Sequence, residues 1–263
     1  MLWAETPAAE RAALFSVRGA RVREEQLRDA GSEPDLWVPL FALALLADEP
    51  TKVDLPRLVQ ACRRIASWAD SCGKPGTRLA FVQASALLRP HDAALATEVA
   101  RLARDRGEIA RAESWFRHAV RVARNRDWEA YTWAYVGLGV LYIRSGNRPA
   151  AATVMQRALR TAERHRVPQL LAAVHHHLFH LSTEAGLLRK AYEHARAALE
   201  HYGPANPAIF GLVADVGRFW LHVGEAGRAL PLFVGAVDGI ADPNIRAMVA
   251  ANVARAAAAV GDR

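Results

Sequence analysis

Glycines recur along this sequence at nearly constant intervals, and all but the last are followed within a few residues by a new run of helix-forming residues. The intervals are 34, 39, 40, 38 and 37 residues. A steady period in this range is typical of stacked helical hairpins rather than of a closed globule, because each hairpin buries its apolar face only against its neighbours. The series consists of Gly73, Gly107, Gly146, Gly186, Gly224 and Gly261.

The residues on either side of these glycines repeat as well. Small and large apolar residues are spaced by three and four, which keeps both kinds on one helix face. The small residues predict a close crossing of two helices, and the glycine predicts a helix end with positive φ. The upstream sets around Gly146 and Gly224 are Tyr135-x2-Leu138-Gly139-x2-Tyr142 and Val213-x2-Val216-Gly217-x2-Trp220, and the downstream sets are Ala151-x3-Met155-x2-Ala158 and Ala229-x3-Phe233-x2-Ala236.

This pattern resembles the tetratricopeptide repeat, W-x2-L-G-x2-Y, then A-x3-F, then P, over about residues 58–261. The period, mostly near 39, is similar to that of longer-repeat bacterial regulatory and signalling members. The resemblance implies an all-α fold, a right-handed α-solenoid of stacked antiparallel helical hairpins. We expect a helical N-terminal cap or degenerate repeat over 1–57, about five hairpins over 58–241, and a terminal half-repeat helix over 242–263.

Composition excludes several other classes of protein. The chain is 52% apolar, which is too high for a disordered chain, and it has two cysteines, which is too few for a disulfide scaffold. The longest apolar stretch, 36–47, has twelve residues, whereas a membrane span needs about 20. The first residues do not have the pattern of a signal peptide, so we expect a cytoplasmic protein.

The net charge of +7 is concentrated in one segment. Residues 101–166 hold 14 arginines against six acidic residues. A local positive field of this kind attracts acidic partners.

In the family that this chain resembles, the first helix of each hairpin lines a concave groove. Carried onto this sequence, that register predicts a basic groove with an adjacent tryptophan and valines, among them Val136. Arginine binds carboxylates bidentately and stacks on aromatic rings. We therefore expect a non-enzymatic scaffold that binds an acidic peptide or partner protein within a larger bacterial complex or signalling system. The groove residues are Arg63, Arg101, Arg104, Trp133, Arg144, His176, His180, Arg218, His222 and Arg255.

The second helices carry another basic set, which supports an alternative. A regulatory module could contact nucleic acid or a nucleoprotein complex through these arginines. Aromatic residues do not interleave with them, which weakens recognition of single strands by stacking. The outer set consists of Arg117, Arg121, Arg124, Arg157, Arg160 and Arg164.

Histidines crowd the segment 175–180. His176, His180 and Glu184 stand at i, i+4 and i+8 on one helix face, a pattern that can hold zinc or nickel. The competing interpretation is a polar groove wall, and we favour it, because the sequence supplies no motif for a nucleophile or an activated water. We expect neither catalysis nor a bound metal or cofactor.

The segment 245–260 is apolar nearly all round, although the end of a solenoid normally presents a polar face. Self-association is one way to cover this surface.

Overall fold

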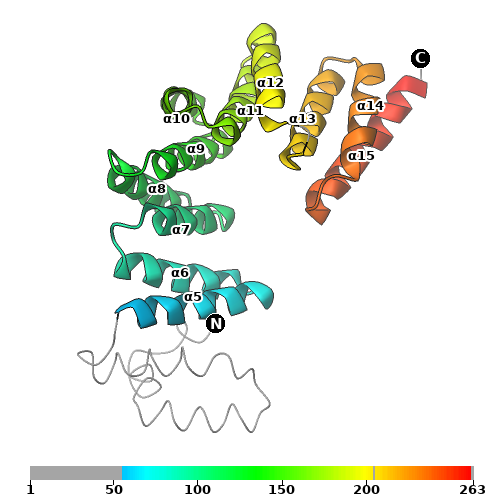
Figure 1. The fold of residues 1–263 in the computed structure, drawn as a ribbon. Coiled ribbons are helices and arrows are strands. Elements are labelled where there is room, and N and C mark those ends of the chain that lie inside the picture. Colours follow the sequence, from blue (N-terminus) through cyan, green and yellow to red (C-terminus); the bar gives the residue numbers. More distant parts are fainter. Residues whose placement is uncertain (1–54, 204, 262–263) are drawn as a thin grey trace, which may run out of the picture. The chain divides into compact units, whose positions relative to one another are not determined.

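The computed structural model describes residues 55–203 and 205–261, and every regular element in these ranges is an α-helix (Figure 1). The predicted all-α fold is therefore confirmed. None of the described helices is both long enough and apolar enough to cross a membrane. The expected N-terminal cap lies outside the described residues, apart from 55–57. The helices are α5 (Leu55–Ser71), α6 (Pro75–Leu88), α7 (Ala93–Asp105), α8 (Ile109–Ala123), α9 (Trp128–Arg144), α10 (Arg148–His165), α11 (Pro168–Glu184), α12 (Leu188–Tyr202), α13 (Ala208–His222), α14 (Ala226–Val237) and α15 (Pro243–Gly261).

Five of the recurring glycines end a helix in the left-handed conformation, with φ between 63° and 84°. After each of them, the next backbone N–H donates to the carbonyl five residues earlier, as Asn147 does to Tyr142 at 2.9 Å. This hydrogen bond closes the helix, and glycine suits the turn because it has no Cβ. Gly261 is different, because it is the last residue of α15 and not a turn residue. The five are Gly73, Gly107, Gly146, Gly186 and Gly224.

The described residues fall into two compact units, and the boundary between them lies after residue 137, within α9. In the N-terminal unit, α5 packs against α6, α6 against α7, and α7 against α8. In the C-terminal unit, the successive helices α10 to α15 pack each against the next, and α13 also contacts α15. Each unit is thus built from neighbours in sequence, as the repeat predicts.

The small and large residues of the repeat meet inside each unit. Phe116 on α8 is fully buried against Gly137 on α9, where an added Cβ would overlap its ring. Phe233 on α14 is likewise buried against Gly217 on α13, where a Cβ would come within 2.9 Å of the ring. The glycines are needed because the ring of the facing helix occupies the space of a side chain.

Candidate functional site

The predicted groove cations of the N-terminal unit are partly neutralised by carboxylates. Arg63 lies 3.4 Å from Glu98, and Arg104 lies 2.9 Å from Asp105. Arg101 on α7 is exposed and forms no ion pair within the described part of the chain. Of these three arginines, Arg101 is therefore the one with its charge available to a ligand.

Helix α9 is buried on every side over residues 134–139, and its exposed residues lie before and after this stretch. Trp133 is 39% exposed, and Arg144 is exposed at the end of the helix. The placement of Val136 in the groove is wrong, because Val136 is 5% exposed. It follows Trp133 by three residues, so it is rotated about 60° around the helix, toward the core.

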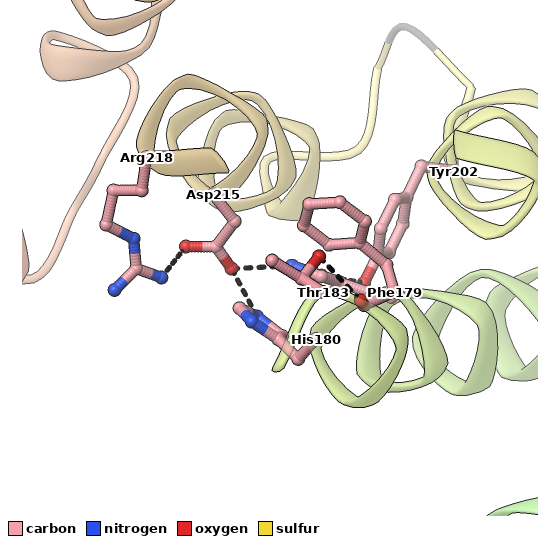
Figure 2. Close-up of polar contacts among 7 residues, drawn as sticks. Phe179, His180, Thr183, Tyr202, Asp215 and Arg218 are labelled. Carbon is pink, nitrogen blue, oxygen red and sulfur yellow. Dashed lines mark hydrogen bonds and ion pairs between the residues drawn. The ribbon is translucent and has the colours of Figure 1, made fainter. Parts of the chain in front are cut away.

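In the C-terminal unit, three predicted groove residues converge on one carboxylate that the sequence analysis did not select (Figure 2). Asp215 on α13 accepts hydrogen bonds at Oδ2 from Nε2 of His176, at 2.8 Å, and from Nε2 of His180, at 2.6 Å. Its Oδ1 accepts a hydrogen bond from Arg218, one turn along α13. We call these four residues the Asp215 cluster. It joins α11 to α13.

The Asp215 cluster is half-buried, and its carboxylate is ionised. The Asp215 side chain is 15% exposed. Burial by itself would raise the pKa of this carboxyl. The hydrogen bonds from His176 and His180, together with the charges of His180 and Arg218, outweigh burial and hold the pKa well below its usual range.

The other ring nitrogen of His176 is also engaged. Its Nδ1 lies 3.2 Å from the hydroxyl of Tyr202, which ends α12. Burial, together with the nearby charge of Asp215, raises the pKa of Tyr202 to about 12, so the phenol keeps its proton. Helices α11, α12 and α13 therefore all contribute to the surroundings of His176.

The neighbouring His175 belongs to a separate set of rings. Its Nδ1 lies 3.0 Å from Nδ1 of His194 on α12, and its ring stacks with that of His201. Burial, reinforced by His194 and His201, lowers the pKa of His175 to about 4. This ring is therefore neutral at pH 7.

The remaining groove residues are exposed. His222 lies at the end of α13, and Arg255 on α15 donates to Asn252 at 3.3 Å. Glu184, the carboxylate of the considered metal set, is instead 3.0 Å from Arg148 on α10. On α15, Ile245 and Met248 are 45% and 44% exposed, and self-association through this helix stays a prediction.

The outer arginines are also exposed, but they lie in different surroundings. Arg117 pairs with Glu113, whereas Arg157, Arg160 and Arg164 lie along α10. Arg121 and Arg124 line an open depression of about 520 Å³ whose lining contains no carboxylate among the residues that the structure describes. We call it the basic depression, and its lining is Pro90, His91, His118, Arg121, Val122, Arg124, Asn125 and Arg126.

Sequence reasoning missed Asp215 in the cluster, Tyr202 beside it, and His91, His118 and Arg126 in the depression. A signal for Asp215 was present, since an acid three residues before Arg218 lies on the same helix face. No comparable signal marks the depression, because it joins the turn before α7 to the end of α8.

Comparison with known proteins agrees with this architecture. Residues 92–164 match the tetratricopeptide repeat family. No curated protein matches the sequence.

Among solved structures, the chain resembles BtubC (BKLC) from P. vanneervenii, with 20% identity, a TM-score of 0.56, and coverage of 80% of this chain and 86% of that one. It also resembles TTC0263, a thermophilic tetratricopeptide protein of Thermus thermophilus, with 19% identity, a TM-score of 0.55, and coverage of 74% and 98%. A third similar structure is the Cut9–Hcn1 hetero-tetramer of the APC/C, with 12% identity and a TM-score of 0.57. The matched region covers 94% of this chain and 48% of that one.

At these identities the structures establish the fold, and the family match comes from the sequence. Residues 92–164 thus match the tetratricopeptide repeat, and the repeating turns and glycine–phenylalanine contacts extend the same helical-hairpin fold to the other described helices.

Proposed function

We propose that this chain is a non-enzymatic protein-interaction scaffold that binds an acidic segment of a partner protein. The tetratricopeptide fold is in general a scaffold for protein interaction, and this supports the broader part of the proposal. The long repeat period and the arginine-rich composition favour a place in a larger bacterial complex or signalling system.

The observation that carries the acidic partner is the state of Arg101. It lies on the first helix of a hairpin, it is exposed, and no carboxylate of the described residues neutralises it. Arg63, Arg104 and Arg218 already have acidic neighbours. A carboxylate of a partner would gain a charge-assisted, bidentate contact with Arg101 without displacing another acid.

Trp133 adds an apolar contact. Trp133 is 39% exposed on a helix whose next six residues are buried, and it offers a flat ring to a ligand. Binding energy in protein interfaces is concentrated in a few such tryptophan and arginine side chains. We therefore place the main binding contribution of the N-terminal unit at Arg101 and Trp133.

The test is the affinity of the full chain for a labelled deca-glutamate peptide, measured by fluorescence anisotropy at low salt. Arg101→Glu is expected to weaken binding by about tenfold or more, because a charge-assisted hydrogen bond is worth about 1.5–3 kcal/mol. Arg189→Glu is the matched control, since it makes the same charge change at an arginine that is 93% exposed on α12 and pairs with Glu193. Equal losses in both variants would reduce the proposal to a general effect of net charge.

A second candidate is supported by the basic depression. Its three arginines and two histidines, with no carboxylate among the described lining residues, suit a phosphate backbone. Here a labelled 20-base-pair DNA duplex is the probe, and the double variant Arg121→Glu/Arg124→Glu is expected to abolish its binding. Binding of the nucleic acid that is lost in this double variant and retained in Arg101→Glu would favour this candidate over the acidic segment.

The natural partner is then sought by affinity purification of the tagged chain from its host, with and without nuclease. A protein that is retained after nuclease treatment and lost with Arg101→Glu supports the scaffold. Loss of every bound component on nuclease treatment moves the function to nucleic acid.

A further inference from the structure

The Asp215 cluster has the chemistry of a metal site. Three of its residues, His176, His180 and Asp215, have ligand atoms that all lie within 4.8 Å of one another. In the described part of the chain, no other set of three or more histidine, cysteine or acidic residues meets this criterion. His176 and His180 come from one face of α11, one turn apart, and Asp215 faces them from α13. Two imidazoles and a carboxylate are the common protein ligands of zinc and related ions.

The distances leave little to rearrange. Zinc binds nitrogen and oxygen at about 2.0–2.1 Å, so ligand atoms of a tetrahedral site lie about 3.3 Å apart. In this structure Asp215 Oδ2 is 2.8 Å from His176 Nε2 and 2.6 Å from His180 Nε2. An ion at the centre would move these atoms apart by roughly half an ångström, which small side-chain rotations provide.

The surroundings also orient the ligands. When Nε2 of a neutral imidazole binds a metal, the ring proton is on Nδ1 and needs an acceptor. For His176 this acceptor is the Tyr202 hydroxyl, 3.2 Å from Nδ1. Arg218 holds the other oxygen of Asp215 and fixes the carboxylate, which leaves Oδ2 for the ion.

Access is open on one side. The side chain of His180 is 31% exposed, whereas those of His176 and Asp215 are 14% and 15% exposed. A fourth ligand can therefore be water or a group of a bound partner. The positive charge of Arg218 opposes the ion, so the affinity is expected to be lower than that of a structural zinc site with four protein ligands.

We propose that His176, His180 and Asp215 form a binding site for a divalent transition-metal ion of the zinc class, which ties α11 to α13 in the C-terminal unit. This revises the expectation of no metal, and it replaces Glu184 of the considered set by Asp215. Magnesium and calcium are not expected to bind, because they prefer sites made of oxygen ligands alone.

The experiment is a calorimetric titration of zinc into the metal-free full chain. We expect one equivalent to bind, with an affinity at least tenfold lower in His180→Ala and in Asp215→Asn. Tyr202→Phe keeps all three ligands but removes the acceptor for His176, and it is expected to lower affinity about tenfold. Zinc is also expected to raise the melting temperature of the wild-type chain and not that of His180→Ala, and magnesium to raise neither.

Two variants serve as controls. Glu184→Gln is expected to retain zinc binding, because Glu184 pairs with Arg148 instead. His175→Ala is also expected to retain it, and it tests the nearby His175–His194 pair as a rival site. The proposal is overturned by a wild-type chain that takes up no zinc, by unchanged affinity in both His180→Ala and Asp215→Asn, or by loss of binding in His175→Ala. Circular dichroism of each variant checks that it is folded.

Discussion

The Asp215 cluster and the basic depression both contain residues that the repeat pattern selects, but their charges are arranged in opposite ways. In the cluster, two histidines and an arginine surround one half-buried carboxylate. In the depression, three arginines and two histidines line an open surface without a carboxylate among the described residues. The first arrangement pairs its charges within the fold, so that removing one partner leaves the others uncompensated, whereas the second leaves its charge available to a ligand.

The largest expected difference between the two regions is in the free energy of unfolding. Asp215→Ala leaves His176, His180 and Arg218 facing one another without their shared acceptor. We expect a loss of about 2–3 kcal/mol, below the full value for a buried pair because Arg218 is 41% exposed. Urea denaturation followed by circular dichroism at neutral pH measures this loss.

The matched control for this loss is Glu184→Gln, which breaks an exposed ion pair with Arg148. It is expected to change the free energy of unfolding by less than about 0.5 kcal/mol. A cost below about 1 kcal/mol for Asp215→Ala would class the cluster with such exposed pairs and remove the contrast between the two regions.

Position along the repeat was predictable from sequence, whereas pairing was not. The equivalent positions of His180 and Arg218 in successive repeats follow from the glycine period. Their shared contact with Asp215 depends on the distance between α11 and α13, which a pattern within single helices does not encode. The same limit explains the depression, where His91 and His118 lie 27 residues apart in sequence.

Burial also changes side-chain properties in ways that the sequence does not show. Val136 and Trp133 both fit an apolar groove face, but the packing around α9 buries one and exposes the other. His175 and His176 are adjacent in sequence, yet their rings face different partners, His194 for one and Asp215 for the other. Composition and period predict the helices, and three-dimensional contacts decide which polar groups are available.

A histidine beside the cluster provides the second test, in the pH dependence of stability. Burial lowers the pKa of His175 from 6.5 to about 4. Between these values the unfolded chain takes up a proton at this ring and the folded chain does not. The free energy of unfolding is therefore not reduced by this ring above pH 6.5, and it falls as the pH decreases from 6.5 toward 4, because protonation of His175 favours the unfolded chain.

We expect His175→Leu to remove about 1–2 kcal/mol of the stability loss in this range, after allowing for solvent screening of a half-buried ring. Denaturation of both chains at pH 7 and pH 4.5 measures the difference. His222→Leu makes the same substitution at an exposed ring and is the control. An identical pH dependence for the wild type and His175→Leu would contradict the buried, neutral state of His175.

The smallest effect is expected in the basic depression, and it has the opposite sign. Arg126 lies beside Arg121 and Arg124 in the depression and two residues before the start of α9, where the helix dipole is positive. Arg126→Gln removes both repulsions and is expected to stabilise the chain by about 0.3–0.5 kcal/mol at low salt. At about 1 M salt, where charges are screened beyond roughly 3 Å, the gain should vanish. A gain that persists at high salt would mean that arginine repulsion is not its cause, and the contrast with the Asp215 cluster would then rest on the cluster alone.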